Sequence, residues 1–531
     1  MKNKFLHAPK FVSLLLIGVL LITSTPAIAF SAIPATHWSY TITQNLIKYQ
    51  VIGANEPYKP GDGINAVAFS TMLQNIDSDF KSSLSTVSGT VPLTRIEGLR
   101  LVFKALSLET LALQLKELKS PFMDTSSDDA ILNLAVKFKL ISNNSTKTFR
   151  PNERLKIEEA YSLLWNLYKI KILDGFKLHS YYAISSYSQI NYTSNLESLT
   201  FGWSRLEFDA ANNKVLLNTT SANANEYHVP SGYTTALTKV DSTGIAKQLM
   251  VFVNDIRIND TVTQSSKTLT EAIISNPEYT KQVIDEIISH LSNNPYQIDY
   301  DGVLIDFEGL KGATNKANLN QFLTTLNTAL DLKGFTLGVA VHPARKTGLA
   351  YFDGYDFSKI GDLADFIILM AHDYYPKSLS NTEMNSGFAA TPLAPLNEIY
   401  YALEAITDTT HGVKDPKKVF LQLSIDTAQW KIKDGRIINS TPYHPTYSSI
   451  ASRIQSGVVP KFASSSSSPY LEFFDVDGTK NVVWYEDERS TPVKMDIAKL
   501  FGLGGFSVWR LGLIPENIWN AVIGEIEIME K

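Results

Sequence analysis

The chain has 531 residues, of which 44% are hydrophobic and 19% charged, an ordinary globular composition with room for two or more domains. Its net charge of −5 gives no reason to expect nucleic acid or an anionic membrane as a partner. The sequence contains no cysteine, which excludes disulfides, cysteine–zinc sites and thiol catalysis.

The amino terminus carries the pattern of an export signal. Three lysines lie within the first ten residues, an apolar run follows at residues 11–22, and Ala27-Ile28-Ala29 has the A-x-A form of a cleavage site. The run is shorter than the roughly 20 residues that a membrane-spanning helix needs. We therefore expect residues 1–29 to be a cleaved signal peptide. The mature protein is then secreted, extracellular or associated with the cell wall, with no membrane partner.

Residues 30–172 have a helical and loosely repetitive pattern. Thr94 and Glu97 have the spacing of a capping box in front of an amphipathic helix that runs through Leu106. Repeated units of one helix, a loop and a second helix bury a face against their neighbours. We expect a small helical repeat domain here.

Short motifs in this region resemble S-layer homology repeats. They are His37-Trp38, Thr94-Arg95-Ile96-Glu97 and Phe149-Arg150-Pro151. The resemblance implies binding to a wall polysaccharide, with the Arg of Thr-Arg-x-Glu as the usual contact in that family. The other units read Asn65-Ala66-Val67 and Lys156-Ile157-Glu158 at this position, so a plain helical spacer is an equally open interpretation.

After Tyr181, short apolar runs alternate with helical patterns, which is typical of a parallel α/β sheet. Eight candidate strands over about 350 residues predict a (β/α)8 barrel, which we place at residues 180–531. The candidate strands are residues 182–187, 198–208, 248–254, 302–307, 336–341, 366–370, 419–425 and 505–510.

Residues 427–485, between the last two candidate strands, carry a different pattern. Asp434-Gly435 and Asp477-Gly478 each lie between β-like segments, which is a good hairpin signal. Serines occupy residues 464–468. We expect a small β-rich insertion before the last strand, with the serines in a mobile loop.

The fourth candidate strand ends in two acids. Because strand side chains alternate between faces, Leu304, Asp306 and Glu308 share one side and the intervening apolar residues share the other. The acids then point inward at the carboxyl end, where barrel enzymes keep their catalytic groups. A carboxyl held near a carboxylate has a raised proton affinity, which suits a general acid. The alternative is a structural pair that caps a helix or holds a neighbouring Arg or Lys.

Several motifs in order resemble glycoside hydrolase family 18. They are the Asp-Gly-x-x-x-Asp-x-Glu run at residues 301–308, Met370-Ala371-His372-Asp373-Tyr374, and Trp509. The stretch Trp484-Tyr485-Glu486-Asp487-Glu488-Arg489-Ser490 is similar to the branch that contains spore cortex-lytic N-acetylglucosaminidases. The resemblance covers about residues 181–531 and implies a TIM barrel with glycosidase activity.

The resemblance also implies residue roles. Glu308 matches the acid that protonates the leaving oxygen, and Asp306 matches the residue that orients the substrate's own 2-acetamido group. Asp373 matches a residue that binds the same sugar, and Trp509 matches the tryptophan beneath it.

Four further residues bear on the groove around these groups. Tyr374 and Tyr485 are candidates for lining the groove, with core packing as the alternative. Leu304 stands where the family often has another acid. The pKa of Asp306 must therefore be set differently, by Glu308 alone. His372 replaces a tyrosine that contacts the acetamido oxygen. A neutral imidazole can donate one hydrogen bond in its place, or it can be a supporting residue that does not contact the sugar.

The sequence therefore predicts an exported glycosidase of the chitinase or N-acetylglucosaminidase type. It would cleave β-1,4 links after N-acetylglucosamine in peptidoglycan or chitin by a substrate-assisted, retaining mechanism. We expect a monomer whose partner is this polysaccharide, with no cofactor and no metal. The alternatives are a catalytically weak or inactive glycan-binding barrel and a protein of cell-wall architecture.

Overall fold

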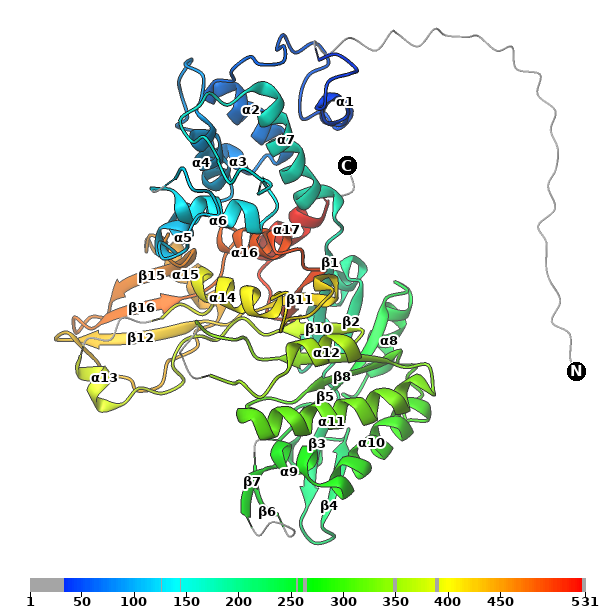
Figure 1. The fold of residues 1–531 in the computed structure, drawn as a ribbon. Coiled ribbons are helices and arrows are strands. Elements are labelled where there is room, and N and C mark those ends of the chain that lie inside the picture. The colour runs from blue at the N-terminus through cyan, green and yellow to red at the C-terminus, as the bar shows by residue number, and fades with distance from the viewer. Residues whose placement is uncertain are drawn as a thin grey trace, which may run out of the picture.

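The computed structural model describes residues 33–125, 127–143, 145–254, 256–260, 265–346, 351–386 and 391–527. A helical amino-terminal region, a barrel and a small β-sheet make up the molecule (Figure 1). The expected signal peptide, residues 1–29, lies outside the described residues. Within the described ranges, no helix combines the length and the apolar character needed to span a membrane.

The amino-terminal region is helical, as predicted. The capping box forms, because the backbone N–H of Glu97 donates to the Thr94 hydroxyl and the N–H of Thr94 donates to the Glu97 carboxylate at 2.7 Å. The helices are α1 (Tyr40–Lys48), α2 (Ala66–Ile76), α3 (Phe80–Leu84), α4 (Arg95–Ala105), α5 (Glu109–Gln114), α6 (Asp129–Lys137) and α7 (Ile157–Tyr168).

Three equivalent loops join these helices in a closed ring of backbone hydrogen bonds. The N–H of Ile64 donates to Leu155 at 3.3 Å, that of Leu155 to Leu93 at 2.7 Å, and that of Leu93 to Ile64 at 2.8 Å. The three residues immediately precede the loop residues that begin α2, α4 and α7. The region is therefore built of three units that meet around one centre.

Eight parallel strands form a closed barrel, which confirms the predicted fold class. Each strand pairs with its neighbour in the order β2-β1-β17-β11-β10-β9-β8-β5, and pairing of β2 with β5 closes the ring. The strands are β1 (Lys177–Tyr182), β2 (Ser198–Phe201), β5 (Ala246–Val253), β8 (Gly302–Asp306), β9 (Thr336–Val341), β10 (Phe366–Leu369), β11 (Val419–Ser424) and β17 (Gly505–Trp509).

Two of the predicted strands were misplaced. The first was expected at 182–187, but β1 begins at Lys177, and a 3-10 helix, η2 (Ser186–Asn195), follows it. The polar residues His179 and Ser180 are buried in β1 and hid its strand character. The candidate at 198–208 is broken at Gly202, and its second half is β3 (Arg205–Asp209), which pairs with β5 and with β4 (Lys214–Asn218).

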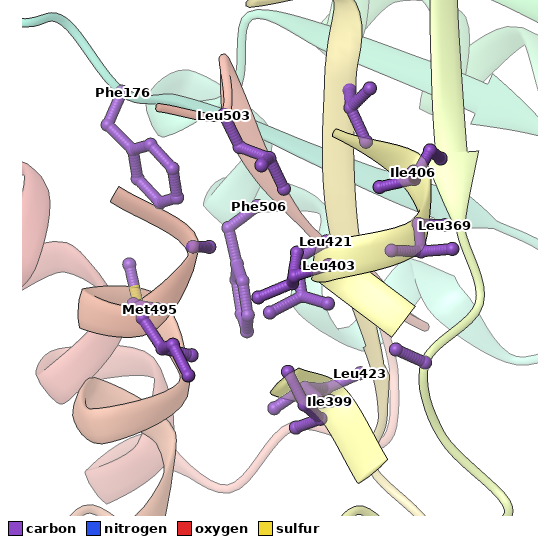
Figure 2. Packing of buried hydrophobic residues seen from close by; sticks show 14 of the residues in the cluster. Phe176, Leu369, Ile399, Leu403, Ile406, Leu421, Leu423, Met495, Leu503 and Phe506 are labelled. Carbon is purple, nitrogen blue, oxygen red and sulfur yellow. The ribbon is translucent and has the colours of Figure 1, made fainter. Parts of the chain in front are cut away.

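Helices cover the barrel and bury the outward strand residues. Leu421 and Phe506 from the strands pack with Leu403 of α14 and Met495 of α16 (Figure 2). The helices around the barrel are α8 (Tyr233–Asp241), α9 (Leu269–Ser275), α10 (Pro277–Ser292), α11 (Gly312–Asp331), α12 (Phe357–Leu363), α14 (Leu396–Ile406), α16 (Ser490–Leu500) and α17 (Glu516–Glu527).

The insertion is a five-stranded antiparallel sheet of order β13-β12-β16-β15-β14. Both Asp-Gly turns join paired strands, as predicted. The serine run is a tight turn, not a mobile loop: Ser466, Ser467 and Ser468 are buried, and the Ser466 carbonyl accepts from the N–H of Leu396. The strands are β12 (Ala428–Lys433), β13 (Arg436–Ile437), β14 (Lys461–Ala463), β15 (Ser468–Phe474) and β16 (Lys480–Trp484), with α15 (Tyr447–Gln455) packed beside them.

A buried cluster of charges joins the helical region to the barrel. The ammonium of Lys171, in the π-helical turn η1 (Lys169–Leu173), lies 2.6 Å from Asp77, 2.6 Å from Asp496 and 3.2 Å from Glu525. Lys499 pairs with Glu525 at 2.7 Å. Three carboxyls thus face two ammoniums away from water. Burial and the charge of Glu525 raise the pKa of Asp496 to about 7, so this site holds a proton up to neutral pH.

Candidate active site

The end of β8 places two carboxyls at the carboxyl end of the barrel. Asp306 is the last strand residue and is 6% exposed, whereas the side chain of Glu308 is 47% exposed. The predicted alternation is present: Val303 and Ile305 pack in the outer core, and Leu304 packs inside the barrel. One acid is therefore buried and the other faces solvent.

The buried acid favours its protonated form. Burial raises the pKa of Asp306 well above its ordinary value, and the nearby charge of Glu308 raises it further. Its Oδ1 atom has no hydrogen-bond partner among the residues that the structure describes. Leu304, at the position where an acid was considered, lies in an apolar cluster with Met250 and Ile368. Burial therefore contributes most to the raised pKa of Asp306 and the charge of Glu308 comes second, whereas the sequence had suggested Glu308 alone.

A second group of polar residues lies at the end of β10. The Nδ1 atom of His372 is 3.4 Å from Oδ1 of Asp373, and its Nε2 atom is 2.9 Å from the side-chain oxygen of Gln422 on β11. Lys377 contacts the other oxygen of Asp373 at 3.0 Å. The side-chain N–H of Gln422 donates to the Ser507 hydroxyl at 3.4 Å, which extends this set of polar contacts into the barrel.

These contacts favour a charged imidazole, in contrast to the neutral one that we expected. Burial alone would lower the pKa of His372, but the adjacent Asp373, the Gln422 amide oxygen and the charge of Glu308 together raise it. Although burial opposes the shift, His372 and Lys377 lower the pKa of Asp373. Both ring nitrogens of His372 face acceptors, which is the arrangement that suits an imidazolium.

Replacing Asp373 by Asn is expected to lower the pKa of His372, because burial then acts without the opposing carboxylate. The stability that a raised histidine pKa supplies is fully present below pH about 6.5 and is lost as the pH rises through the folded-state value. Histidine NMR titration of both proteins measures the shift. An unchanged His372 titration in D373N would show that the carboxylate does not act on this ring.

Trp509 lies at the carboxyl end of the parallel barrel, the same end as the carboxyl pair. It ends β17, is half-buried, and meets the ring of Tyr181 edge to face at 4.9 Å. Burial, together with the charges of Asp306 and Glu308, raises the pKa of Tyr181 well above its ordinary value, so these residues face the same space. Trp509 therefore offers an aromatic face at the end of the barrel that holds the acids.

The structure does not bring Tyr374 or Tyr485 to the carboxyl pair. Asp373 has a left-handed backbone (φ 57°), and the following Tyr374 is buried beneath the Arg345 guanidinium, 5.2 Å from its ring centre. Tyr485 is buried within the insertion, in an apolar cluster with Leu471 and Val483. Their surroundings match the core-packing alternative.

Sequence reasoning missed several residues around the acids. Gln422 stood out as an amide in an otherwise apolar strand, and His342 directly follows a predicted strand, so both had a signal. Tyr355 lies in a loop without periodicity, and its hydroxyl donates to the carbonyl of Phe307 at 2.8 Å, which fixes the chain between the two acids.

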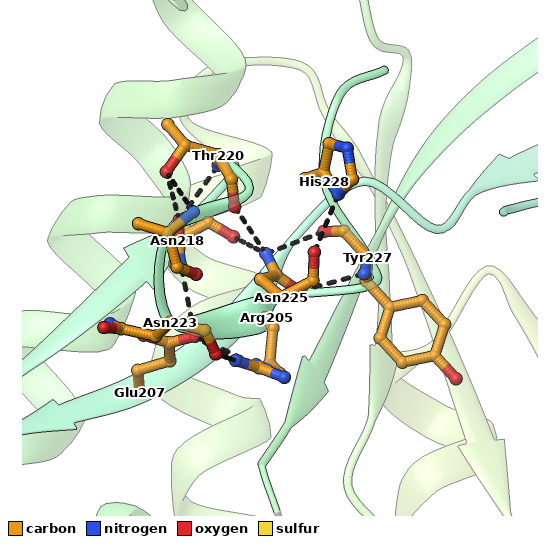
Figure 3. Close-up of polar contacts among 9 residues, drawn as sticks. Arg205, Glu207, Asn218, Thr220, Asn223, Asn225, Tyr227 and His228 are labelled. Carbon is orange, nitrogen blue, oxygen red and sulfur yellow. Dashed lines mark hydrogen bonds and ion pairs between the residues drawn. The ribbon is translucent and has the colours of Figure 1, made fainter.

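Tyr227 faces the acids from the loop between β4 and α8. The amide of Asn225 donates to the carbonyls of Asn218, Thr220 and Tyr227, and its oxygen accepts from the N–H of Tyr227 (Figure 3). The Tyr227 ring points away from this network toward Phe252, 5.2 Å away. Burial, then the charges of Glu226 and the acids, raise its pKa. Tyr227 is a further candidate for contact with a ligand.

A closed parallel barrel with carboxyls at the carboxyl ends of its strands defines a TIM-barrel protein with an enzyme-like site. The family model of glycosyl hydrolases family 18 matches residues 263–513 of the chain. The barrel also resembles the spore cortex-lytic enzyme SleL of Bacillus cereus (TM-score 0.51, 17% identity, 66% of this chain and 74% of that one). A chitinase from Chromobacterium violaceum gives a TM-score of 0.51 at 18% identity, over 66% of this chain and 99% of that one.

Curated relatives match about half of the chain. The cortical fragment-lytic enzyme of Bacillus anthracis is 24% identical over 307 residues, which is 56% of this chain and 64% of the relative. An uncharacterized glycosylase of Bacillus subtilis, YvbX, is 28% identical over 272 residues, 50% of this chain and 71% of the relative. The chain thus spans less than two thirds of the Bacillus anthracis enzyme.

Proposed function

We propose that the barrel is a glycosidase that cleaves β-1,4 links after N-acetylglucosamine by a substrate-assisted, retaining mechanism. The observation that carries this proposal is the pair at the end of β8, a buried Asp306 that favours its proton beside a half-exposed Glu308. The family match at residues 263–513 supports the reaction class.

The two carboxyls divide the chemistry between them. Glu308, which faces solvent, gives its proton to the leaving glycosidic oxygen. The substrate's acetamide N–H approaches Asp306, favours its carboxylate form and so places the shared proton on Glu308. The acetamide oxygen attacks the anomeric carbon and forms an oxazolinium ion. A water then opens this ion as Glu308 takes back a proton, and the anomeric configuration is retained.

The residues around the pair hold the sugar. Trp509 supplies an apolar face, and the His372–Asp373 pair supplies charged hydrogen-bonding groups near the acetamide. We place the substrate in peptidoglycan ahead of chitin, because three related Bacillus enzymes are named cortical fragment-lytic enzymes.

We also propose that the chain is exported after cleavage behind Ala29 and is retained at the cell wall by its helical units. Three units around one centre support a repeat domain. Arg95, the expected polysaccharide contact, is paired with Glu159 and donates to the Phe149 carbonyl, so wall binding would need other groups as well. Sequencing the amino terminus of secreted protein tests the export.

The test of the function uses chitooligosaccharides and purified peptidoglycan with the mature protein, and identifies reducing ends by mass. We expect products that end in N-acetylglucosamine, more readily from peptidoglycan. Binding to peptidoglycan with no product from either polymer would contradict the proposal and favour a role in wall architecture.

A further inference from the structure

A histidine that is 13% exposed lies next to the proposed acid. His342 directly follows β9, and its Nε2 atom is 3.7 Å from Oε2 of Glu308. The ring is stacked on Phe352 at 4.1 Å between centres, and Tyr355 meets it edge to face at 5.9 Å. Aromatic packing on two sides fixes the orientation of the imidazole, with one nitrogen toward Glu308.

The imidazole of His342 is neutral over the range in which a glycosidase works. Burial, and after it the charge of His372, lower its pKa to about 3 against the opposing effect of Asp373. A neutral imidazole has one donor and one acceptor, so it can pair with a carboxyl without adding a charge beside it. His342 therefore differs from His372, whose surroundings favour the charged form.

The Nε2 atom of His342 is shielded from solvent and makes no hydrogen bond within the described part of the chain. A buried polar atom of this kind carries a free-energy cost unless it gains a partner. At 3.7 Å the contact with Glu308 is longer than a hydrogen bond. Catalytic hydrogen bonds are often long in free enzymes and shorten when the substrate is bound.

We propose that His342 is a positioning residue for Glu308. The inference rests on the proposed function, because it concerns how the acid is oriented. When a sugar covers the exposed side of Glu308, the contact with Nε2 shortens to a hydrogen bond and holds one carboxyl oxygen. The other oxygen then faces the glycosidic oxygen that receives the proton. The aromatic rings keep the imidazole at the distance that this requires.

The test compares His342→Phe, which keeps the aromatic packing, with His342→Asn, which restores an N–H group. Because a misplacement of about 1 Å can cost about 100-fold in rate, we expect H342F to lower kcat by about 10- to 100-fold with KM nearly unchanged. H342N should regain a measurable part of kcat. His290→Phe is the matched control: His290 is another histidine with a buried, unpaired Nε2 among the described residues, on α10. H290F should keep the wild-type kcat.

A vibrational measurement separates this inference from the proposed function. The carbonyl stretch of protonated Glu308, assigned by its loss in E308Q, is expected at higher wavenumber in H342F than in the wild type with a chitooligosaccharide bound, because a hydrogen bond weakens the C=O bond. The same band position in both proteins, or equal losses of kcat in H342F and H342N, would overturn the role of His342. No cleavage by the wild type would overturn the proposed function. The position of the Glu308 carbonyl band would still show whether the hydrogen bond with Nε2 of His342 forms.

Discussion

Replacing Glu308 by Gln is expected to lower kcat/KM on N-acetylglucosamine oligomers by about 10²- to 10⁴-fold, the usual contribution of a general acid. The amide keeps the shape of the side chain but has no proton to give to the leaving oxygen. Glu308 is half-exposed, so the substitution leaves the core untouched, and we expect an unchanged melting temperature. Initial rates measured by reducing-end release give the ratio.

The control for E308Q is Glu286→Gln. Glu286 is a partly exposed glutamate on α10 that pairs with Lys214 at 3.4 Å, and it lies on an outer helix of the barrel. E286Q should retain the wild-type rate. A value for E308Q within tenfold of the wild type would mean that another group protonates the leaving oxygen.

Replacing Lys171 by Met is expected to destabilise the protein by about 3–5 kcal/mol, the usual cost of removing one partner from a buried ion pair. Lys171 lies between Asp77 of the helical region and both Asp496 and Glu525 of the barrel. Without its ammonium, three buried carboxyls would face Lys499 alone in the described cluster. Urea unfolding followed by circular dichroism measures the loss.

Lys281→Met is the matched control for this substitution. Lys281 is 69% exposed and pairs with Asp285 one helical turn away, so its removal should change the free energy of unfolding by less than about 0.5 kcal/mol. Equal unfolding midpoints for K171M and the wild type would show that the charge cluster does not hold the two regions together.

The barrel could be predicted because local patterns agreed with the global fold. The β8 segment is the clearest case, since alternation along five residues placed Leu304 inside the barrel and Asp306 at its carboxyl end. The Asp-Gly hairpins of the insertion were equally local signals. The start of β1 was missed because two polar residues gave the strand a polar pattern: His179 hydrogen-bonds to Ser507 inside the barrel, and the Ser180 hydroxyl donates to the Val508 carbonyl of the neighbouring strand.

The electrostatics of the site could not be predicted, because they depend on contacts between distant segments. His372 was expected to be neutral, and the difference comes first from Asp373, with Gln422 on the next strand and Glu308 adding to it against the effect of burial. The left-handed conformation of Asp373, which precedes the buried Tyr374, had no signal in the sequence. The Lys171 cluster joins four segments that no motif connects.

The anomeric configuration of freshly released product tests the central claim most directly. Proton NMR of a chitooligosaccharide, recorded in the first minutes of cleavage and before mutarotation, distinguishes the two anomers. We expect the β-anomer to appear first, because the acetamide of the substrate performs the first displacement and water performs the second. Appearance of the α-anomer first would contradict the roles assigned to Asp306 and Glu308.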